Sequence, residues 1–243
     1  MERLMTSPRD AEAVAAEFKD YAYSVSHDLS APVRAMVEFS HILSTEHTAG
    51  LSANAKEYLS IIIDNGKKLQ AMMDGLLAYS RLNTAARPFA MVDCNYVLAE
   101  SVSALASKIK AAGAEINIAH LPSFSGDETQ LVQLFTVLLD NALTYRRRDS
   151  ALQISVSAER VGEQWKITVA DNGIGIAARH QQRIFRFFQR LHTDEEYPGV
   201  GMGLALAHKI MQRHCGDIAC VPDYSPGAAF YVLFPAIANT GQG

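Results

Sequence analysis

A histidine and an aspartate stand side by side in the stretch SVSHDLSAPVRA, as His27 and Asp28. Neutral imidazole leaves one ring nitrogen free to attack an electrophile while the other carries a proton, and a neighbouring carboxylate can orient that tautomer. Pro32 follows in the same helical pattern, where it removes the hydrogen bond to the Asp28 carbonyl at a cost of about 3 kcal/mol. The stretch therefore places a candidate nucleophile beside a proline that disturbs the helix.

Two glycine-rich stretches have the composition of nucleotide and phosphate sites. In VADNGIGI the Asp171 carboxylate emerges where a strand ends, and Gly173 and Gly175 permit close approach of a ligand to the backbone. In GVGMGLALAHKI three glycines lead into a helix whose first amides can donate to an anion: Gly199, Gly201 and Gly203. Each stretch alone also fits an ordinary turn or a flexible loop.

A further candidate is Asn141, in the helical stretch LLDNALTYRRR. Its carboxamide oxygen suits a magnesium ion that also holds phosphates, because magnesium takes few protein ligands beside phosphate and water. A lone asparagine on a helix is usually a surface amide. The assignment to Asn141 therefore depends on the other stretches.

Two long helices are predicted to carry the histidine, between about residues 10 and 82. Alternating steps of four and three mark a bundle seam in the second helix: Ala55, Leu59, Ile62, Gly66, Leu69, Met73, Leu76 and Ser80. In the first helix, Val25 and Leu29 place His27 on the opposite face, where we expect its ring in solvent. The stretch STEHTAGLSAN reads as the turn of a hairpin. Because two helices leave the seam uncovered, we expect a homodimer that forms a four-helix bundle.

A different class of pattern follows Pro88. Helices are predicted at 93–112, 127–146 and 203–214, and strands at 115–119, 152–158, 164–170, 217–221 and 228–234. This mixture predicts a two-layer α/β sandwich. The expected organisation is a linker at 1–9, an all-α helical hairpin domain at 10–83, a linker at 84–92, the α/β domain at 93–237 and a tail at 238–243.

Composition excludes some classes of partner and setting. The 243 residues are 49% hydrophobic and carry 22 Lys and Arg against 26 Asp and Glu, so we expect neither nucleic acid nor an anionic membrane surface as a partner. The cysteines are odd in number and lack metal-ribbon spacing, which favours a reduced, cytoplasmic setting and disfavours a metal cluster of Cys215 and Cys220 with His208 and His214. No apolar run reaches 18 residues, so we expect no membrane segment in a chain that is either a cytoplasmic protein or the cytosolic portion of a longer sensor.

The order of these stretches resembles the sensor histidine kinases of two-component signalling. The resemblance runs from about residue 15 to 235 and rests on the His-Asp pair, the Asn141 helix, DNGIGI, RIFRFFQRL and the final glycine stretch. SHDLSAPVRA is similar to phytochrome-type and hybrid kinases. The resemblance implies a dimerisation and histidine-phosphotransfer hairpin joined to a Bergerat ATP-binding domain, the fold of Hsp90, gyrase and MutL.

The resemblance also implies a role for each matching residue. His27 would be the phosphoacceptor with Asp28 as its acid/base neighbour, Asn141 would bind magnesium, and Asp171 would accept a hydrogen bond from the adenine amino group. Arg190 would approach the terminal phosphate, Phe185 and Phe188 would pack a flexible lid, and the five glycines would line the base and phosphates. The remaining nucleotide contacts would come from Tyr145, Arg146, Ile176 and Leu204.

The implied function is an ATP- and Mg²⁺-dependent protein-histidine kinase that autophosphorylates His27 and passes the phosphoryl group to an aspartate of a response regulator receiver domain. Val137 and Thr144 depart from the family, which usually has Asn and a basic residue there, although Arg146 or Arg147 can compensate. These departures support an alternative, a weakly catalytic dimeric scaffold or phosphotransfer protein with a degraded ATP site. Ala31 replaces a residue that positions water, which predicts weak phosphatase activity.

Overall fold

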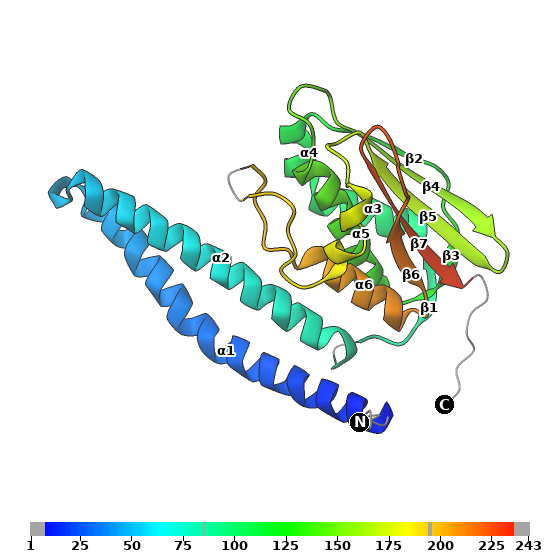
Figure 1. Ribbon diagram of the computed structural model, residues 1–243, viewed down its shortest axis with the longest axis horizontal. Helices are drawn as coiled ribbons and strands as arrows, with labels where there is room; N and C mark the ends of the chain where they lie inside the picture. Colours follow the sequence, from blue (N-terminus) through cyan, green and yellow to red (C-terminus); the bar gives the residue numbers. More distant parts are fainter. Residues whose placement is uncertain (1–7, 85, 194–195, 236–243) are drawn as a thin grey trace, which may run out of the picture. The chain divides into compact units, whose positions relative to one another are not determined.

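The computed structural model describes residues 8–84, 86–193 and 196–235, with side chains from Ser26 onward except at positions 27, 49, 83 and 84 (Figure 1). The chain divides after Thr84 into two compact units. The first unit is a helical hairpin and the second an α/β sandwich, which confirms the predicted fold class. The expectation that the His27 ring lies in solvent falls outside the described side chains.

The hairpin consists of α1 (Pro8–Glu46) and α2 (Ala53–Thr84), joined by the short 3-10 turn η1 (Thr48–Gly50). Val33 is buried between the helices, and Gly66 of α2 leaves room for the side chain of Val37. α1 continues through Pro32, and the Ser30 hydroxyl donates to the carbonyl of Ser26 at 2.7 Å. The Ser26 carbonyl thus gains a side-chain donor in the same stretch of helix in which the Asp28 carbonyl lacks its usual amide donor from position 32.

The second unit is built on a mixed five-stranded sheet of order β2-β4-β5-β7-β6, in which only β2 and β4 are parallel. The strands are β2 (Glu115–Ile118), β4 (Gln153–Val161), β5 (Gln164–Asp171), β6 (Asp217–Cys220) and β7 (Ala228–Pro235). Ile154 and Val156 of β4 are buried while their neighbours are exposed, as expected for a sheet covered on one face.

Helices cover that buried face, as Figure 1 shows for α3, α5 and α6. The helical elements are α3 (Cys94–Ala104), α4 (Ala106–Ala112), α5 (Glu128–Thr144) and α6 (Gly203–Arg213), with the short η2 (Ala178–His180) and η3 (Arg183–Phe185). Leu131, Leu134 and Leu138 of α5 are buried, and their spacing gives the helix one apolar face toward the sheet. In the described part of the chain, no helix is long and apolar enough to span a membrane.

Three local features differ from the predicted elements. The helix expected at 93–112 is broken at Leu105, whose side chain is buried while none of α4 is, so the chain turns where a side chain is drawn into the core. A two-stranded antiparallel sheet of β1 (Ala90–Asp93) and β3 (Ser123–Gly126) was not predicted. β1 begins inside the segment expected to be a linker, and β3, with the sequence SFSG, offers one apolar residue among small ones.

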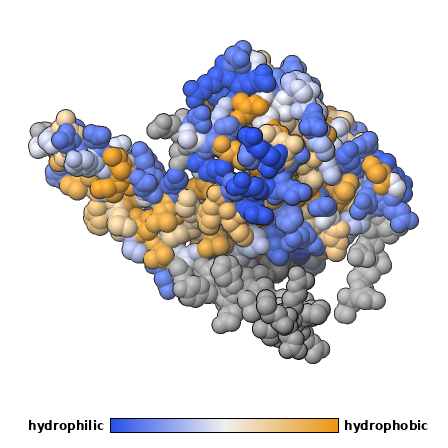
Figure 2. Space-filling view, viewed as in Figure 1, coloured by the Kyte–Doolittle hydropathy of each residue, from blue (hydrophilic) through white to orange (hydrophobic). Residues whose placement is uncertain are grey.

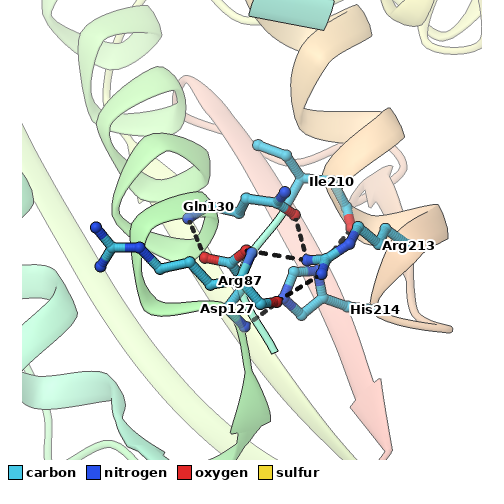
Figure 3. A network of polar contacts seen from close by, with 6 residues as sticks. All are labelled: Arg87, Asp127, Gln130, Ile210, Arg213 and His214. Atoms are coloured by element: carbon cyan, nitrogen blue, oxygen red, sulfur yellow. Dashed lines mark hydrogen bonds and ion pairs between the residues drawn. The ribbon is translucent and has the colours of Figure 1, made fainter. Parts of the chain in front are cut away.

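A polar network holds the start of the second unit against two helices (Figure 3). Asp127, only 2% exposed, caps α5 by accepting from the amide of Gln130, and it also accepts from the amide of Arg87 at 2.8 Å. Arg213, at the end of α6, donates to the Asp127 carboxylate at 3.2 Å and to the Arg87 carbonyl at 2.8 Å. Both backbone polar groups of Arg87 are therefore fixed just after the boundary between the units.

His214 completes this network as a neutral ring. Its Nε2 accepts from the amide of Asp127 at 3.0 Å, so the proton lies on Nδ1, which donates to the carbonyl of Ile210 at 2.8 Å. Phe89 stacks on the imidazole with ring centroids 4.6 Å apart. Burial lowers the pKa of His214, and the nearby Arg213 cation lowers it further, against the opposing effects of the Ile210 carbonyl and Asp127.

We expect the buried neutral His214 to make stability depend on pH. Because its pKa is lowered on folding, the unfolded chain takes up the proton first as the pH falls below about 6.5. The free energy of unfolding of the wild type should therefore fall with decreasing pH in this window. Urea denaturation at pH 7.5 and 5.5 measures the difference, and His214→Gln should reduce it.

His120→Gln is the matched control, since His120 is exposed and lies outside the network. It should keep the pH dependence of the wild type. An unchanged pH dependence in His214→Gln would mean that other groups account for it.

Candidate functional site

Asp171 is the last residue of β5 and carries a carboxylate held by two backbone amides. Its Oδ1 accepts from Gly173 at 2.8 Å and from Ala228 of β7 at 3.3 Å. Burial raises the pKa of Asp171 above its ordinary value of 3.8, and the two amides act in the opposite direction. The carboxylate is thus oriented from one side, as an acceptor for a ligand must be.

Glycine is required beside this carboxylate because the chain packs closely on itself. A Cβ at Gly173 would lie 2.5 Å from the carbonyl oxygen of Tyr145 and 2.7 Å from Asp171 Oδ1. Gly175 has a φ of +79°, and a Cβ there would lie 3.0 Å from the Gly227 carbonyl oxygen. Ile176, one residue on, lines a shallow pocket together with Ala228 and Ala229.

One stripe of α5 connects this turn to the glycine stretch before α6. Val137, Asn141 and Tyr145 follow one another at four-residue spacing and are all half-buried. At one end, the Tyr145 carbonyl accepts from the amide of Ile174 at 3.1 Å. At the other end, a Cβ at Gly203 would lie 3.1 Å from Cγ1 of Val137. Asn141 therefore lies between the Asp171 turn and the beginning of α6.

The side chain of Asn141 has the character of an incomplete polar site. Its Nδ2 atom is buried and has no hydrogen-bond partner among the described residues. A buried amide without a partner costs about 1–3 kcal/mol unless a ligand satisfies it. Because the oxygen and nitrogen of an amide are assigned rather than observed, the group can offer either atom. Its oxygen would suit a metal ion that carries phosphates.

The glycine stretch before α6 is the third part of the candidate site, after the Asp171 turn and the stripe of α5. Gly201 has a φ of +72°, and a Cβ there would lie 2.9 Å from the Gln189 carbonyl oxygen. Nothing lies within 4 Å of the corresponding position at Gly199. α6 then begins at Gly203, with Leu204 half-buried in its first turn, and the first amides of a helix have no partner within it. This end of α6 is suited to an anion.

The two predicted lid residues, Phe185 at the end of η3 and Phe188 after it, differ in their surroundings. Phe185 is half-buried and meets Phe230 edge to face, with centroids 6.5 Å apart. Phe188 is 49% exposed and has a positive φ of 56°. The guanidinium of Arg190 donates to the carbonyls of Thr193, at 3.2 Å, and Tyr197. Arg190 is thus engaged within its own loop, and its expected role toward the terminal phosphate stays a prediction.

The arginines after Asn141 also bind backbone groups. Arg146 donates to the Leu143 carbonyl at 2.9 Å, and Arg147 donates through Nε to the Gly173 carbonyl at 3.0 Å. Sequence reasoning missed the contact of Arg147 because nothing in its position along the chain points to Gly173. It also missed Asn172, whose side chain binds the amide of Gln153 and the carbonyl of Ala151, each at 2.9 Å. The Asp-Asn-Gly turn was the available signal for Asn172.

The predicted phosphoacceptor and its acidic neighbour belong to the helical hairpin. His27 and Asp28 lie in α1, and the Asp28 residue is exposed. The structure therefore brings Asp171, Asn141 and the glycines together in one site of the α/β unit. His27 and Asp28 are carried separately by the hairpin.

Two family models match the chain, one within each region just described. Residues 19–85 match the His Kinase A (phospho-acceptor) domain. Residues 126–238 match the histidine kinase-, DNA gyrase B-, and HSP90-like ATPase. The chain therefore belongs to the sensor histidine kinases of two-component signalling, and it carries their phosphoacceptor hairpin and their ATP-binding domain.

The relatives include a cyanobacterial phytochrome and a phytochrome-like protein. Cyanobacterial phytochrome A of Nostoc sp. is 38% identical over 93% of this chain and 29% of its own length. Phytochrome-like protein Cph1 of Synechocystis sp. is 32% identical over 96% of this chain and 31% of its own length. These matches confirm the resemblance to phytochrome-type kinases, and the chain spans less than a third of either relative.

A solved structure has the same fold. Full-length ShkA in complex with AMPPNP superposes with a TM-score of 0.65 and 24% identity, over 92% of this chain and 47% of that chain. At this identity the similarity establishes the arrangement of the elements.

We expect Gly173→Ala to impair the site directly. The added methyl group must displace either the Tyr145 carbonyl or the Asp171 carboxylate, and such overpacking typically costs about 1–3 kcal/mol. The affinity for ADP, measured by isothermal titration calorimetry, should fall by about tenfold or more.

Gly50→Ala controls for the general effect of replacing glycine, because nothing lies within 4 Å of its Cβ position. This variant should bind ADP like the wild type. Wild-type affinity in Gly173→Ala would show that the turn can move without loss.

Proposed function

We propose that the chain is an ATP-dependent protein-histidine kinase that autophosphorylates His27 and transfers the phosphoryl group to an aspartate of a response regulator receiver domain. The observation that carries the proposal is the buried, unsatisfied amide of Asn141 between the Asp171 turn and the start of α6. Family membership supplies the phosphoacceptor hairpin.

The site offers a place for each part of Mg-ATP. Asp171 would accept a hydrogen bond from the adenine amino group, beside Gly173 and Gly175. The phosphates would lie against Gly199, Gly201 and the amides that begin α6, with Tyr145, Arg146, Ile176 and Leu204 around the nucleotide. Asn141 would hold the magnesium ion, which when bound neutralises phosphate charge.

The reaction asks the protein mainly for positioning. An uncharged nitrogen of His27 attacks the terminal phosphorus, a P–N bond forms, and the bond between that phosphorus and the bridging oxygen breaks to release ADP. Asp28 would accept a hydrogen bond from the opposite ring nitrogen, stabilise the attacking tautomer and take up the proton which that nitrogen loses as the P–N bond forms. Transfer to a receiver aspartate then exchanges this P–N bond for an acyl phosphate, and return of the proton restores neutral His27.

A weakly catalytic scaffold or phosphotransfer protein remains the second candidate. One observation favours it: Val137 presents methyl groups to Gly203 where the family usually has an asparagine. The stripe of α5 thus offers one amide, that of Asn141, rather than two. Thr144 likewise leaves out a usual basic residue, and Arg146 is engaged with the Leu143 carbonyl.

Autophosphorylation distinguishes the two candidates. Wild-type protein incubated with magnesium and terminally labelled ATP should acquire acid-labile label, because a P–N bond hydrolyses in acid. His27→Ala should lose this label while still binding ADP, since His27 belongs to the hairpin and the proposed nucleotide site is built from the α/β unit.

His41→Ala is the matched control, because His41 is also on α1 and exposed. It should be labelled like the wild type. Label that persists in His27→Ala would exclude His27 as the acceptor, and ADP binding without any label in the wild type would favour the scaffold.

The hairpin supports the proposal that the protein is a homodimer. Leu29, Met36 and Leu43 of α1 recur at seven-residue spacing and are 46%, 56% and 46% exposed. Ile62 and Leu69 of α2 have the same spacing and are 47% and 41% exposed. Figure 2 shows apolar side chains gathered along the hairpin. A second copy would cover this heptad stripe in a four-helix bundle.

We expect Met36→Glu to dissociate the dimer. Each of the two copies would bury a carboxylate in an apolar seam, so the dimer dissociation constant should rise by about 100-fold or more. Light scattering coupled to size-exclusion chromatography at micromolar concentration measures the change in mass.

Lys67→Glu places the same carboxylate at an exposed position of α2 off the heptad stripe. This control should remain dimeric. A monomeric wild type, or a dimeric Met36→Glu, would contradict the proposed seam.

A further inference from the structure

Two hydrogen bonds from one short segment hold a single peptide group of the Asp171 turn. The carbonyl of Gly173 accepts from Arg147 Nε at 3.0 Å, and the amide of Ile174 donates to the carbonyl of Tyr145 at 3.1 Å. Because these two groups belong to the same peptide bond, its plane is held from both ends. The holding residues are the C-cap of α5 and the second residue after it.

The orientation of this peptide matters because Gly173 is a residue without a side chain of its own to restrain it. Glycine has the widest range of backbone torsions, so its conformation must be set by external bonds. On its amide side, Gly173 donates to Asp171 Oδ1 at 2.8 Å. On its carbonyl side it accepts from Arg147. Arg147 thus holds the carbonyl of Gly173, and the amide of the same residue holds the Asp171 carboxylate.

Arginine suits this position better than a simple positive charge. Nε belongs to a planar group of fixed donor directions, whereas a lysine ammonium is a flexible point charge. Arg147 contacts the turn next to Asp171, in contrast to Arg146, which contacts its own helix. Compensation for the missing basic residue at position 144 would require Arg147 to point toward the phosphates, and its observed bond ties it to the turn beside the base.

We propose that Arg147 is a positioning residue that determines the selectivity of the site for adenine. It acts through Gly173 by keeping the Asp171 carboxylate directed at the amino group on the base. This inference rests on the proposed nucleotide function. A site built to bind an amino group discriminates against a base that lacks it, because a buried acceptor is then left without its donor.

The experiment compares ADP with inosine diphosphate, whose base has a carbonyl group where adenine has the amino group. Isothermal titration calorimetry with magnesium present gives both affinities for the wild type, Arg147→Ala, Arg147→Lys and Arg148→Ala. Arg148→Ala is the matched control, because it removes an equal charge from the next residue, whose guanidinium lies 3.5 Å from the Glu196 carbonyl. Thermal unfolding of each variant verifies that the fold is intact.

The wild type should prefer ADP, and Arg147→Ala should lower the affinity for ADP by about tenfold while changing that for inosine diphosphate by less than about twofold. Arg147→Lys should keep part of the preference for ADP, and the control Arg148→Ala should keep the full preference of the wild type. An equal loss for both nucleotides in Arg147→Ala would overturn the proposal by showing a phosphate contact, and an unchanged preference would overturn it outright.

These outcomes separate the inference from the proposed function. A wild type that binds ADP and labels His27, with an Arg147→Ala variant of unchanged preference, refutes only the role of Arg147. A wild type that binds ADP without labelling His27 refutes the kinase and leaves the selectivity test valid. A wild type that binds neither nucleotide refutes both.

Discussion

The buried carboxylate of Asp127 is the constraint around which the α/β unit is arranged. An ionised group almost excluded from water must be fully paired, and here the partners come from three directions: the first turn of α5, the guanidinium of Arg213 and the amide of Arg87. Satisfying this one group therefore fixes the start of α5, the end of α6 and the point at which the chain enters the unit. The neutral ring of His214 completes the arrangement by accepting the amide of Asp127.

The position of α5 in turn determines the geometry of the proposed nucleotide site. Its N-terminus is held by Asp127, and its C-terminal end lies close enough to the Asp171 turn that only glycine fits at position 173. Between these ends, Val137 meets the start of α6, and the buried Nδ2 of Asn141 has no hydrogen-bond partner within the described part of the chain. Any shift of α5 toward the Asp171 turn would therefore also change its contact with the start of α6. Because the interior is closely packed, holding the N-terminus of α5 at Asp127 also fixes the position of its C-terminal end beside the Asp171 turn.

The elements that carry recognisable chemistry were predictable, and the connections between them were not. The seam of α2, the helix of Asn141 and the strand that ends at Asp171 each have a periodicity long enough to be read along the chain. β1 and β3 instead pair with each other across 30 to 36 positions of sequence, a contact that no local pattern records. The break at Leu105 was likewise invisible, since a leucine drawn into the core looks the same in sequence as one that continues a helix.

The sequence by itself determined the family, the order of the domains and the types of residue available for phosphate chemistry, because these follow from local patterns in a recognisable order. Only the tertiary structure decided which of those residues meet. Arg147 reached the Gly173 carbonyl rather than the proposed phosphate region, and Arg213 reached the carbonyl of Arg87, which lies 126 positions earlier in the chain. The physical reason is that side-chain hydrogen bonds depend on distances between elements, which the packing of α5 and α6 on the sheet establishes and no local pattern encodes.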